Sequence, residues 1–207
     1  MKKEKIVIFD LDGTLIDSKN IYIDTIRKSL LEHYFIYPTS RISKALGPKL
    51  EITLNNIRRF SPPMLKKLKN KINKSITKKA KSVKLAPYAK DTLRKLRENG
   101  NKVILLTNSA GKFALTALKS HKIAKYFNKF FYSENFKSKE DAIKAIARKY
   151  NAKVKDVFYI ADKVNDVRIA RAAGCKIVIV LAKSWDKDNF KGKSYAISSL
   201  KDLEKKI

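Results

Sequence analysis

The chain has 207 residues, of which 44% are hydrophobic, and its 48 Lys and Arg against 19 Asp and Glu give a formal net charge of +29. This length allows one or two domains with a sizeable core, and the hydrophobic content excludes an intrinsically disordered chain. No apolar run approaches the roughly 20 residues of a membrane-spanning helix, so we expect no membrane partner. Cys175 is the single cysteine, which excludes an intramolecular disulfide.

The positive charge extends along the whole chain. A net charge of this size attracts polyanions, so nucleic acid has to be considered as a partner. However, the lysines form neither a basic arm nor a stripe with interleaved aromatic residues. We therefore favour a lysine-rich source proteome over nucleic-acid binding as the origin of the charge. A single cysteine and the lack of a signal-peptide pattern before the first expected strand predict a cytoplasmic protein.

An apolar run over residues 6–9 ends in two aspartates, Asp10 and Asp12, followed by Gly13. A buried parallel strand here would bring both aspartates to the edge of the sheet where ligands bind in open α/β folds, and Gly13 would allow a sharp turn. Mg²⁺ takes oxygen ligands and is usually held by one or two carboxylates plus substrate phosphate. The alternative is an ordinary strand followed by an Asp-Gly turn.

Residues 16–85 show helical spacing and no strand signal. Loop signals at residues 37–39 and 47–49 divide the segment. The pattern predicts a small all-helical domain over residues 16–85, inserted into a second domain formed by residues 1–15 and 86–207. The expected helices cover residues 17–34, 40–46, 50–60 and 61–81.

From residue 87 onward, helix and strand patterns alternate. Such alternation requires right-handed crossovers and predicts an α/β fold, a Rossmann-like, doubly wound parallel sheet covered on both faces. The expected helices cover residues 88–99, 112–121, 138–150, 164–173 and 200–206, and the expected strands cover residues 102–107, 130–132, 157–160, 176–181 and 195–197. Ser138 and Asp141 form a candidate capping box at the start of the helix over residues 138–150.

Polar side chains follow each of the main expected strands. Thr107, Asn108 and Ser109 come at the end of one strand, and Asp162 and Asp166 come after another. A lysine pair, Lys137 and Lys139, stands at the entrance of the helix over residues 138–150. Carboxylates, hydroxyl and amide donors, and an ammonium group are the groups that phosphoryl transfer uses. Because the carboxyl ends of parallel strands meet at one edge of the sheet, these groups are expected to converge.

With these motifs the chain resembles the haloacid dehalogenase superfamily of phosphohydrolases over essentially its whole length. Residues 10–14, Asp-Leu-Asp-Gly-Thr, match the first family motif, and residues 106–108, Leu-Thr-Asn, match the second. Residues 162–166 match the fourth motif in its D-x-x-x-D form, although Ala161 replaces the glycine that often precedes it. The resemblance implies phosphoryl chemistry, since dehalogenases of the superfamily lack an aspartate equivalent to Asp12.

The lysine of the third family motif has two candidates. Lys137 and Lys139 both stand at spacings from Asp162 that subgroups of the family use, and the K-P-x-P pattern is absent. Lys139, at the start of the expected helix, resembles the phosphoserine-phosphatase arrangement, and we prefer it. The other lysine is then a solvated surface charge.

The resemblance implies a two-step mechanism. Asp10 would attack phosphorus and form an aspartyl-phosphate, while Asp12 would act first as general acid and then as general base. Thr107 and Asn108 would contact phosphoryl oxygens, and the third-motif lysine would offset negative charge. The cofactor would be Mg²⁺, and the family places its ligands at Asp10, the backbone carbonyl of Asp12 and Asp162, with Asp166 acting on the metal's shell.

The same resemblance identifies residues 16–85 as a type-one cap, a helical lid that excludes water and reads the leaving group. The loop over residues 47–49 resembles the substrate-contacting loop of phosphoglycolate-phosphatase-like members. Lys49 could therefore bind a carboxylate or a second phosphate, or it could be an ordinary loop lysine. Asp17 and Ser18 lie at the expected hinge, and Trp185 is expected to be a packing residue.

The implied function is that of a Mg²⁺-dependent phosphatase acting on a small phosphorylated metabolite such as phosphoglycolate, a sugar phosphate or a nucleotide. A phosphomutase of the same fold would carry the same motifs. A nucleic-acid-binding or end-processing protein would use the charge of +29. The sequence leaves open whether the protein is a monomer or a homodimer.

Overall fold

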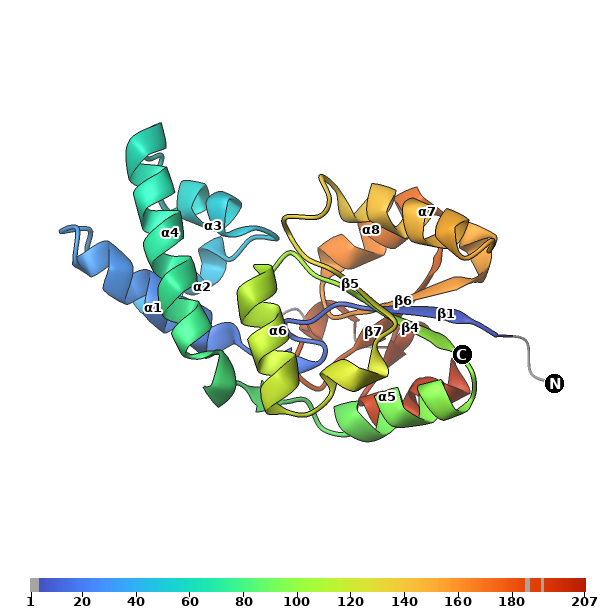
Figure 1. The fold of residues 1–207 in the computed structure, drawn as a ribbon. Coiled ribbons are helices and arrows are strands. Elements are labelled where there is room, and N and C mark those ends of the chain that lie inside the picture. Colours follow the sequence, from blue (N-terminus) through green and yellow to red (C-terminus); the bar gives the residue numbers. More distant parts are fainter. Residues whose placement is uncertain (1–3, 185–186, 191) are drawn as a thin grey trace.

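The computed structural model describes residues 4–184, 187–190 and 192–207, and Trp185 lies outside these ranges. Its centre is a six-stranded sheet in the order β5-β4-β1-β6-β7-β8, in which each pair of neighbouring strands is parallel (Figure 1). The predicted α/β fold is therefore confirmed. The strands are β1 Ile6–Phe9, β4 Lys102–Leu106, β5 Lys129–Phe131, β6 Val157–Ala161, β7 Lys176–Val180 and β8 Ala196–Ile197.

Helices cover both faces of this sheet, as Figure 1 shows with α7 and α8 above it and α5 below it. Successive residues of a strand face opposite sides, so β1 contributes to two cores. Ile6 and Ile8 belong to the core under α7 and α8, while Val7 and Phe9 belong to the core under α5 and α6. The helices of this part are α5 Ala89–Glu98, α6 Gly111–Ser120, α7 Lys139–Lys149 and α8 Val164–Ala173.

A block of four helices stands beyond the carboxyl ends of the strands, at the left of Figure 1. Each helix contributes a buried apolar side to a shared interior, with Ile26, Leu54 and Ile72 among the fully buried residues. This interior is continuous with the core under α5 and α6, so the block packs on the sheet-bearing part. The helices are α1 Lys19–Leu31, α2 Thr39–Ala45, α3 Leu50–Ile57 and α4 Pro62–Lys78.

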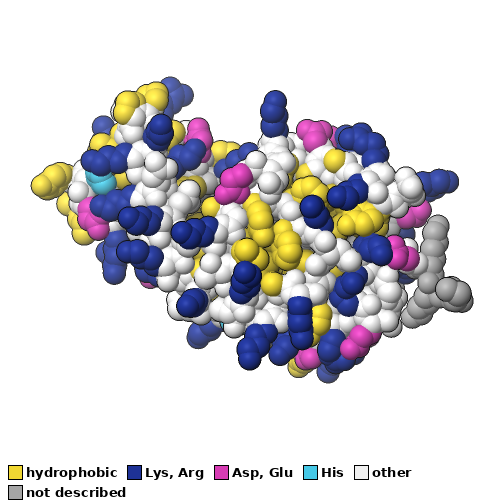
Figure 2. Space-filling view, in the orientation of Figure 1, with side chains coloured by type: hydrophobic (Ala, Val, Ile, Leu, Met, Phe, Trp, Pro, Cys, Tyr) yellow, Lys and Arg dark blue, Asp and Glu magenta, His cyan; other side chains and the backbone are white. Residues whose placement is uncertain are grey.

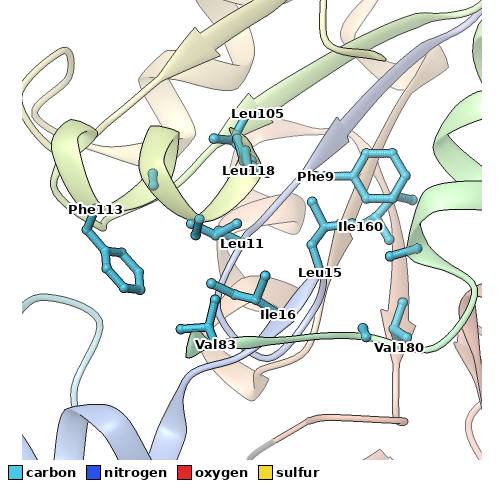
Figure 3. Close-up of a cluster of buried hydrophobic side chains, with 14 of the residues drawn as sticks. Phe9, Leu11, Leu15, Ile16, Val83, Leu105, Phe113, Leu118, Ile160 and Val180 are labelled. Carbon is cyan, nitrogen blue, oxygen red and sulfur yellow. The ribbon is translucent and has the colours of Figure 1, made fainter. Parts of the chain in front are cut away.

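The turn after β1 joins the two parts through apolar packing. Leu11, Leu15 and Ile16 are completely buried and point into the cluster drawn in Figure 3. Phe113 and Leu118 of α6 lie on the other side of the same cluster. The residues that carry the Asp-x-Asp motif are thus anchored by hydrophobic side chains directly beside them, which limits the movement of the motif.

The expectation that residues 16–85 contain no strand is wrong. Ile16–Asp17 (β2) pairs antiparallel with Lys84–Leu85 (β3), so a two-stranded ribbon connects the helical block to the sheet. Two residues per strand are too few to show a periodicity of two, which is why the sequence pattern missed this ribbon. The ribbon brings the entrance and the exit of the block together.

The last expected helix is also different. Leu200–Lys205 forms a 3₁₀ helix. Leu200 and Leu203 are both buried, and a helix with three residues per turn places residues three apart on one side. In the described ranges, no helix combines the length and the apolar character that crossing a bilayer requires.

The basic side chains do not gather in one patch on the face drawn in Figure 2, where Lys and Arg spread over both the helical block and the α/β part. Acidic side chains are interspersed with them. On this face the distribution agrees with the even spacing of lysines along the sequence.

Candidate active site

A cavity of about 670 Å³ lies between the carboxyl ends of the strands and the helical block. Asp10, Thr107 and Asn108 line it from the α/β part, and Tyr22 and Lys49 line it from the block. The strand tips that the sequence predicted to converge therefore face one cavity. Its wall includes six lysines, namely Lys19, Lys44, Lys49, Lys69, Lys139 and Lys163, and four acidic residues, namely Asp10, Asp12, Glu51 and Asp166.

Asp10 directly follows β1, and its backbone N–H donates to the carbonyl oxygen of Ile160 at 2.8 Å. One carboxylate oxygen accepts the backbone N–H of Leu11 at 2.8 Å, and the other lies 2.9 Å from Nζ of Lys139. Burial raises the pKa of the Asp10 carboxyl to about 6, against the opposing effect of the Lys139 charge. Asp10 is thus a buried carboxylate that depends on a cation.

Lys139 is the first residue of α7, and 5% of it is exposed. Besides Asp10, its Nζ lies 3.4 Å from Oδ1 of Asp166 and donates to the hydroxyl of Tyr159 at 2.7 Å. Burial alone would lower the pKa of the Lys139 ammonium, but the charges of Asp10 and Asp166 outweigh it and raise that pKa. Lys139 therefore stays a cation inside the protein.

Lys137, the other candidate lysine, is exposed. Between the two lysines, Ser138 caps α7, and its Oγ accepts the backbone N–H of Asp141 at 3.1 Å. The chain turns into the helix at this cap, so Lys139 enters the interior while Lys137 stays outside. The backbone carbonyl of Lys137 accepts a hydrogen bond from Nζ of Lys49 at 3.2 Å.

Three buried carboxylates converge beside Lys139. Asp10, Asp162 and Asp166 each have one carboxylate oxygen that lies within 4.8 Å of those of the other two. The formal charge of three carboxylates and one ammonium is −2, which a divalent cation would neutralise. An all-oxygen donor set of this kind fits a hard cation such as Mg²⁺. Bringing buried like charges this close costs free energy, which such a counter-ion would offset.

Gly13 makes this convergence geometrically feasible. Its φ is +81°, and a Cβ at this position would collide with the Asp162 carboxylate, whose Cγ would be 2.6 Å away. Glycine is thus required both by the left-handed backbone and by the space that Asp162 occupies. Thr14, the next residue, contacts Oδ1 of Asp162 through its hydroxyl at 3.4 Å.

Asp12 lies in a different setting, because its partners are hydroxyl groups. Oδ1 accepts the hydroxyl of Ser18 at 2.5 Å, and Oδ2 accepts the hydroxyl of Ser109 at 2.5 Å. Ser109 in turn lies 2.8 Å from the hydroxyl of Tyr22, a residue of α1. Burial raises the pKa of the Tyr22 phenol well above its usual value, and the nearby Asp12 adds to this effect.

Thr107 and Asn108 follow β4 at the cavity wall. Thr107 is completely buried, and its Oγ1 accepts the backbone N–H of Ser109 at 3.0 Å, so its own hydrogen can turn toward the cavity. Oδ1 of Asn108 is a buried polar atom for which the described part of the chain supplies no hydrogen-bond partner. Such an atom at a cavity wall is typical of a group that meets a ligand or water.

Sequence reasoning missed Tyr22 and Tyr159, and it noted Ser109 at the strand end without giving it a role. Tyr159 is fully buried in β6, and its hydroxyl donates to Oδ1 of Asp166 at 2.8 Å while it accepts from Lys139. Burial raises its pKa well above the usual value. The available signal was a polar aromatic residue within an otherwise apolar strand. Ser109 directly follows the Thr107-Asn108 motif, which could have indicated a role for it.

Comparison with known proteins gives a consistent result. A model of the haloacid dehalogenase-like hydrolase family matches residues 7–180. A phosphoglycolate phosphatase of Vibrio parahaemolyticus is 25% identical over 188 residues, which cover 83% of this chain and 81% of that protein. A phosphoglycolate phosphatase of Escherichia coli K12 is 30% identical over 97 residues, which cover 45% of this chain and 38% of that protein.

A solved structure shares the fold over nearly the full length. It is described as a predicted phosphoglycolate phosphatase from Haemophilus somnus, and the TM-score is 0.86 with 18% sequence identity. The superposition covers 99% of this chain and 98% of that chain. At this identity the likeness concerns the fold.

Proposed function

The chain belongs to the haloacid dehalogenase-like hydrolase family and is a phosphatase of that family, and on this premise we propose that it hydrolyses a small phosphomonoester through an aspartyl-phosphate on Asp10, with Mg²⁺ as cofactor. The observation that carries the proposal is the buried pair of Asp10 and Lys139, 2.9 Å apart, at the floor of the cavity. A buried carboxylate that attacks an anionic phosphate needs a fixed positive charge beside it, and Lys139 supplies one.

In the first step, a carboxylate oxygen of Asp10 forms a bond to phosphorus while the bond from phosphorus to the leaving-group oxygen breaks. Asp12 donates a proton to that oxygen, so an alcohol departs. The ammonium of Lys139 offsets the charge of the phosphoryl group and of Asp10 together. Asp10 and Asp12 both line the cavity, so both can reach one bound phosphate.

In the second step, water attacks the phosphorus of the aspartyl-phosphate. Asp12, now a carboxylate, takes a proton from the water, and the bond between phosphorus and the Asp10 oxygen breaks. Inorganic phosphate and the Asp10 carboxylate are the products. Asp12 thus gives one proton and recovers one proton in each cycle, and the enzyme returns to its starting state.

The metal would be held by the carboxylates of Asp10 and Asp162, with the backbone carbonyl of Asp12 as a further oxygen ligand and Asp166 at its shell. Mg²⁺ in this position would neutralise charge on the transferring phosphoryl group. The support is the donor set, three buried carboxylates with a formal excess of two negative charges over Lys139.

Thr107 and Asn108 are the groups that we assign to the phosphoryl oxygens. Thr107 can turn its hydroxyl hydrogen into the cavity. Oδ1 of Asn108 lacks a partner among the described residues, and a half-turn of the amide would present its NH₂ group to a phosphoryl oxygen instead. Both residues follow β4 at the strand tip beside β1. A phosphate bound at Asp10 would therefore meet donors from the neighbouring strand.

The helical block, residues 16–85, is proposed to act as a cap that contacts the leaving group and so selects the substrate. The block supplies Lys44, Lys49 and Lys69 to the cavity wall, and Glu51 pairs with Lys69 at 2.6 Å. A wall with this excess of ammonium groups favours a substrate with a second anionic group, a carboxylate or a phosphate. No contact among the described residues specifically favours the phosphomutase or the nucleic-acid alternative.

The test is hydrolysis of a panel of phosphorylated metabolites, 2-phosphoglycolate included, and of p-nitrophenyl phosphate, each with Mg²⁺ and with EDTA. We expect release of inorganic phosphate that requires Mg²⁺ and is lost in Asp10→Asn while the protein keeps its melting temperature within a few degrees. Rapid acid quenching during turnover of ³²P-labelled substrate should trap label on wild-type protein and none on Asp10→Asn. An active Asp10→Asn protein would overturn the proposal.

A further inference from the structure

Both oxygens of the Asp12 carboxylate are held by hydroxyl groups from two separate segments. Ser18, which precedes α1, donates to Oδ1, and Ser109, which follows β4, donates to Oδ2, each at 2.5 Å. Ser18 is completely buried and 6% of Ser109 is exposed. The orientation of Asp12 therefore depends on both the entrance of the helical block and a strand tip of the sheet.

Tyr22 extends this arrangement by one further hydroxyl. Its oxygen lies 2.8 Å from Oγ of Ser109, and because the single proton of Ser109 is donated to Asp12, Tyr22 must be the donor of this hydrogen bond. The ring of Tyr22 packs edge-on against Phe113 of α6, with 5.8 Å between centroids. The hydroxyl is thus held in place from α1 and α6 together.

We propose that Ser109 and Tyr22 are positioning residues for Asp12, an inference that rests on the proposed role of Asp12 in proton transfer. Ser109 holds the carboxyl of Asp12 toward the cavity, and Tyr22 holds Ser109. Both residues line the cavity, and in this proposal both act through Asp12. Through them, α1 of the helical block controls whether Asp12 can deliver its proton.

The chemistry of hydroxyl groups suits this task. Each oxygen of the Asp12 carboxyl keeps a second lone-pair site when it accepts from Ser18 or Ser109, so the proton that Asp12 transfers can lie on the side of the cavity. The hydroxyl of Ser109 can therefore donate to Asp12 and accept from Tyr22 throughout the cycle, at the wall of the cavity that Ser109 lines. No atom has to move far between the two protonation states of Asp12.

A positioning role predicts that damage depends on the leaving group. Phenyl phosphate and p-nitrophenyl phosphate have similar shapes, but phenolate is the poorer leaving group and needs the proton of Asp12 more. In Ser109→Ala and Tyr22→Phe, hydrolysis of phenyl phosphate should therefore fall more than hydrolysis of p-nitrophenyl phosphate. General acid catalysis contributes ~10²–10⁴-fold. We therefore expect the kcat/KM for p-nitrophenyl phosphate, divided by the kcat/KM for phenyl phosphate, to rise about tenfold in Ser109→Ala and about threefold in Tyr22→Phe.

The experiment measures kcat and KM for both substrates at one pH and saturating Mg²⁺, with the melting temperature of each variant. Ser109→Thr, which keeps the hydroxyl, should restore the wild-type ratio. Ser120→Ala on α6 and Tyr195→Phe are matched controls remote from Asp12, and they should leave the ratio unchanged. Tyr22→Phe keeps the ring that packs on Phe113, so it tests the hydroxyl even if Ser109→Ala folds poorly.

Two failures can be told apart. If wild-type hydrolysis does not depend on Asp10, the proposed function fails. Hydrolysis can depend on Asp10 while Ser109→Ala and Tyr22→Phe lower kcat/KM for both substrates by the same factor, or lower it for neither. In that case Ser109 and Tyr22 have no positioning role and this inference is overturned.

Discussion

Asp10 and Asp12 are two residues apart, yet their side chains meet opposite kinds of partner. Asp10 contacts the ammonium of Lys139 and the backbone N–H of Leu11, which can only donate. Asp12 contacts the hydroxyls of Ser18 and Ser109, which can donate or accept. One strand end therefore presents the same side chain twice, once among groups that can only donate a hydrogen bond and once among groups that can also accept one.

The two aspartates also differ in where their partners come from. Those of Asp10 belong to the α/β part, namely α7 and the turn after β1. Those of Asp12 include Ser18 at the start of α1 and, through Ser109, Tyr22 within α1. We call Asp10 with its partners Lys139 and the neighbouring carboxylates the Asp10 half of the site, and Asp12 with its hydroxyl partners the Asp12 half. The Asp10 half lies entirely within the sheet-bearing part, whereas the Asp12 half depends on the helical block.

The strongest way to break the Asp10 half is to remove its cation. Lys139→Met leaves three buried carboxylates without their ammonium partner. We expect a loss of kcat on the order of 10³-fold and a loss of about 3–5 kcal/mol in the free energy of unfolding, because one partner of a buried ion pair is missing. Steady-state assays and urea unfolding measure the two effects.

Lys137→Met is the matched control for this change. Lys137 is exposed, and the contact that it makes with Lys49 uses its backbone carbonyl, which the substitution preserves. Activity and stability should stay within twofold and within about 0.5 kcal/mol of wild type. A larger loss of activity in Lys137→Met than in Lys139→Met would reverse our assignment of the two lysines.

The Asp12 half is broken by Asp12→Asn, which keeps the shape of the side chain but removes its ability to carry the proton. We expect kcat to fall on the order of 10²-fold, the scale of general acid–base catalysis, with the phosphoryl acceptor Asp10 intact. Asp17→Asn is the control, because Asp17 lies at the same junction but pairs with Lys183 at 3.1 Å. If both variants lose activity equally, the role assigned to Asp12 is wrong.

Metal removal tests the same contrast, because the carboxylates that would hold the proposed Mg²⁺ belong to the Asp10 half. At Mg²⁺ about 100-fold above its Kd, stability should rise by about 2.7 kcal/mol, which corresponds to a melting temperature about 5–10 °C higher for a chain of this size. Differential scanning fluorimetry with Mg²⁺ and with EDTA gives this shift.

Asp162→Asn should abolish that shift, since Asp162 is one of the three converging carboxylates and is completely buried. The exposed Asp188→Asn is the control and should retain the full response. An undiminished shift in Asp162→Asn would mean that Mg²⁺ binds elsewhere on the protein.

The convergence of Asp10 with Asp162 was predictable because the carboxyl ends of parallel strands must meet at one edge of the sheet. The sheet itself followed from alternating helix and strand patterns. The position of Lys139 was harder to predict, since two lysines two residues apart at a helix entrance look alike in sequence. Their difference comes from the cap at Ser138, where the chain turns inward.

The hydroxyl partners could not be predicted from the sequence. Tyr22 fits the apolar spacing of its helix and reads as a core residue, and its partner Ser109 is 87 residues away. The ribbon of β2 and β3 escaped because it has two residues per strand. Features that depend on a single long-range contact leave no local pattern, whereas features repeated along a strand or helix do.

The smallest loss of activity is expected at Tyr159, whose hydroxyl bonds to two residues of the Asp10 half but does not contact Asp10. Its hydroxyl accepts from Lys139 at 2.7 Å and donates to Asp166 at 2.8 Å, while Lys139 and Asp166 also meet directly at 3.4 Å. Tyr159→Phe keeps the buried ring and the direct ion pair, so it should cost about 1–2 kcal/mol of stability and less than about tenfold in kcat. Tyr195→Phe is the control for loss of a tyrosine hydroxyl. A loss of kcat as large as that of Lys139→Met would mean that the Tyr159 hydroxyl itself fixes the ammonium on Asp10, and the ion pair alone would then not be enough to hold the nucleophile in place.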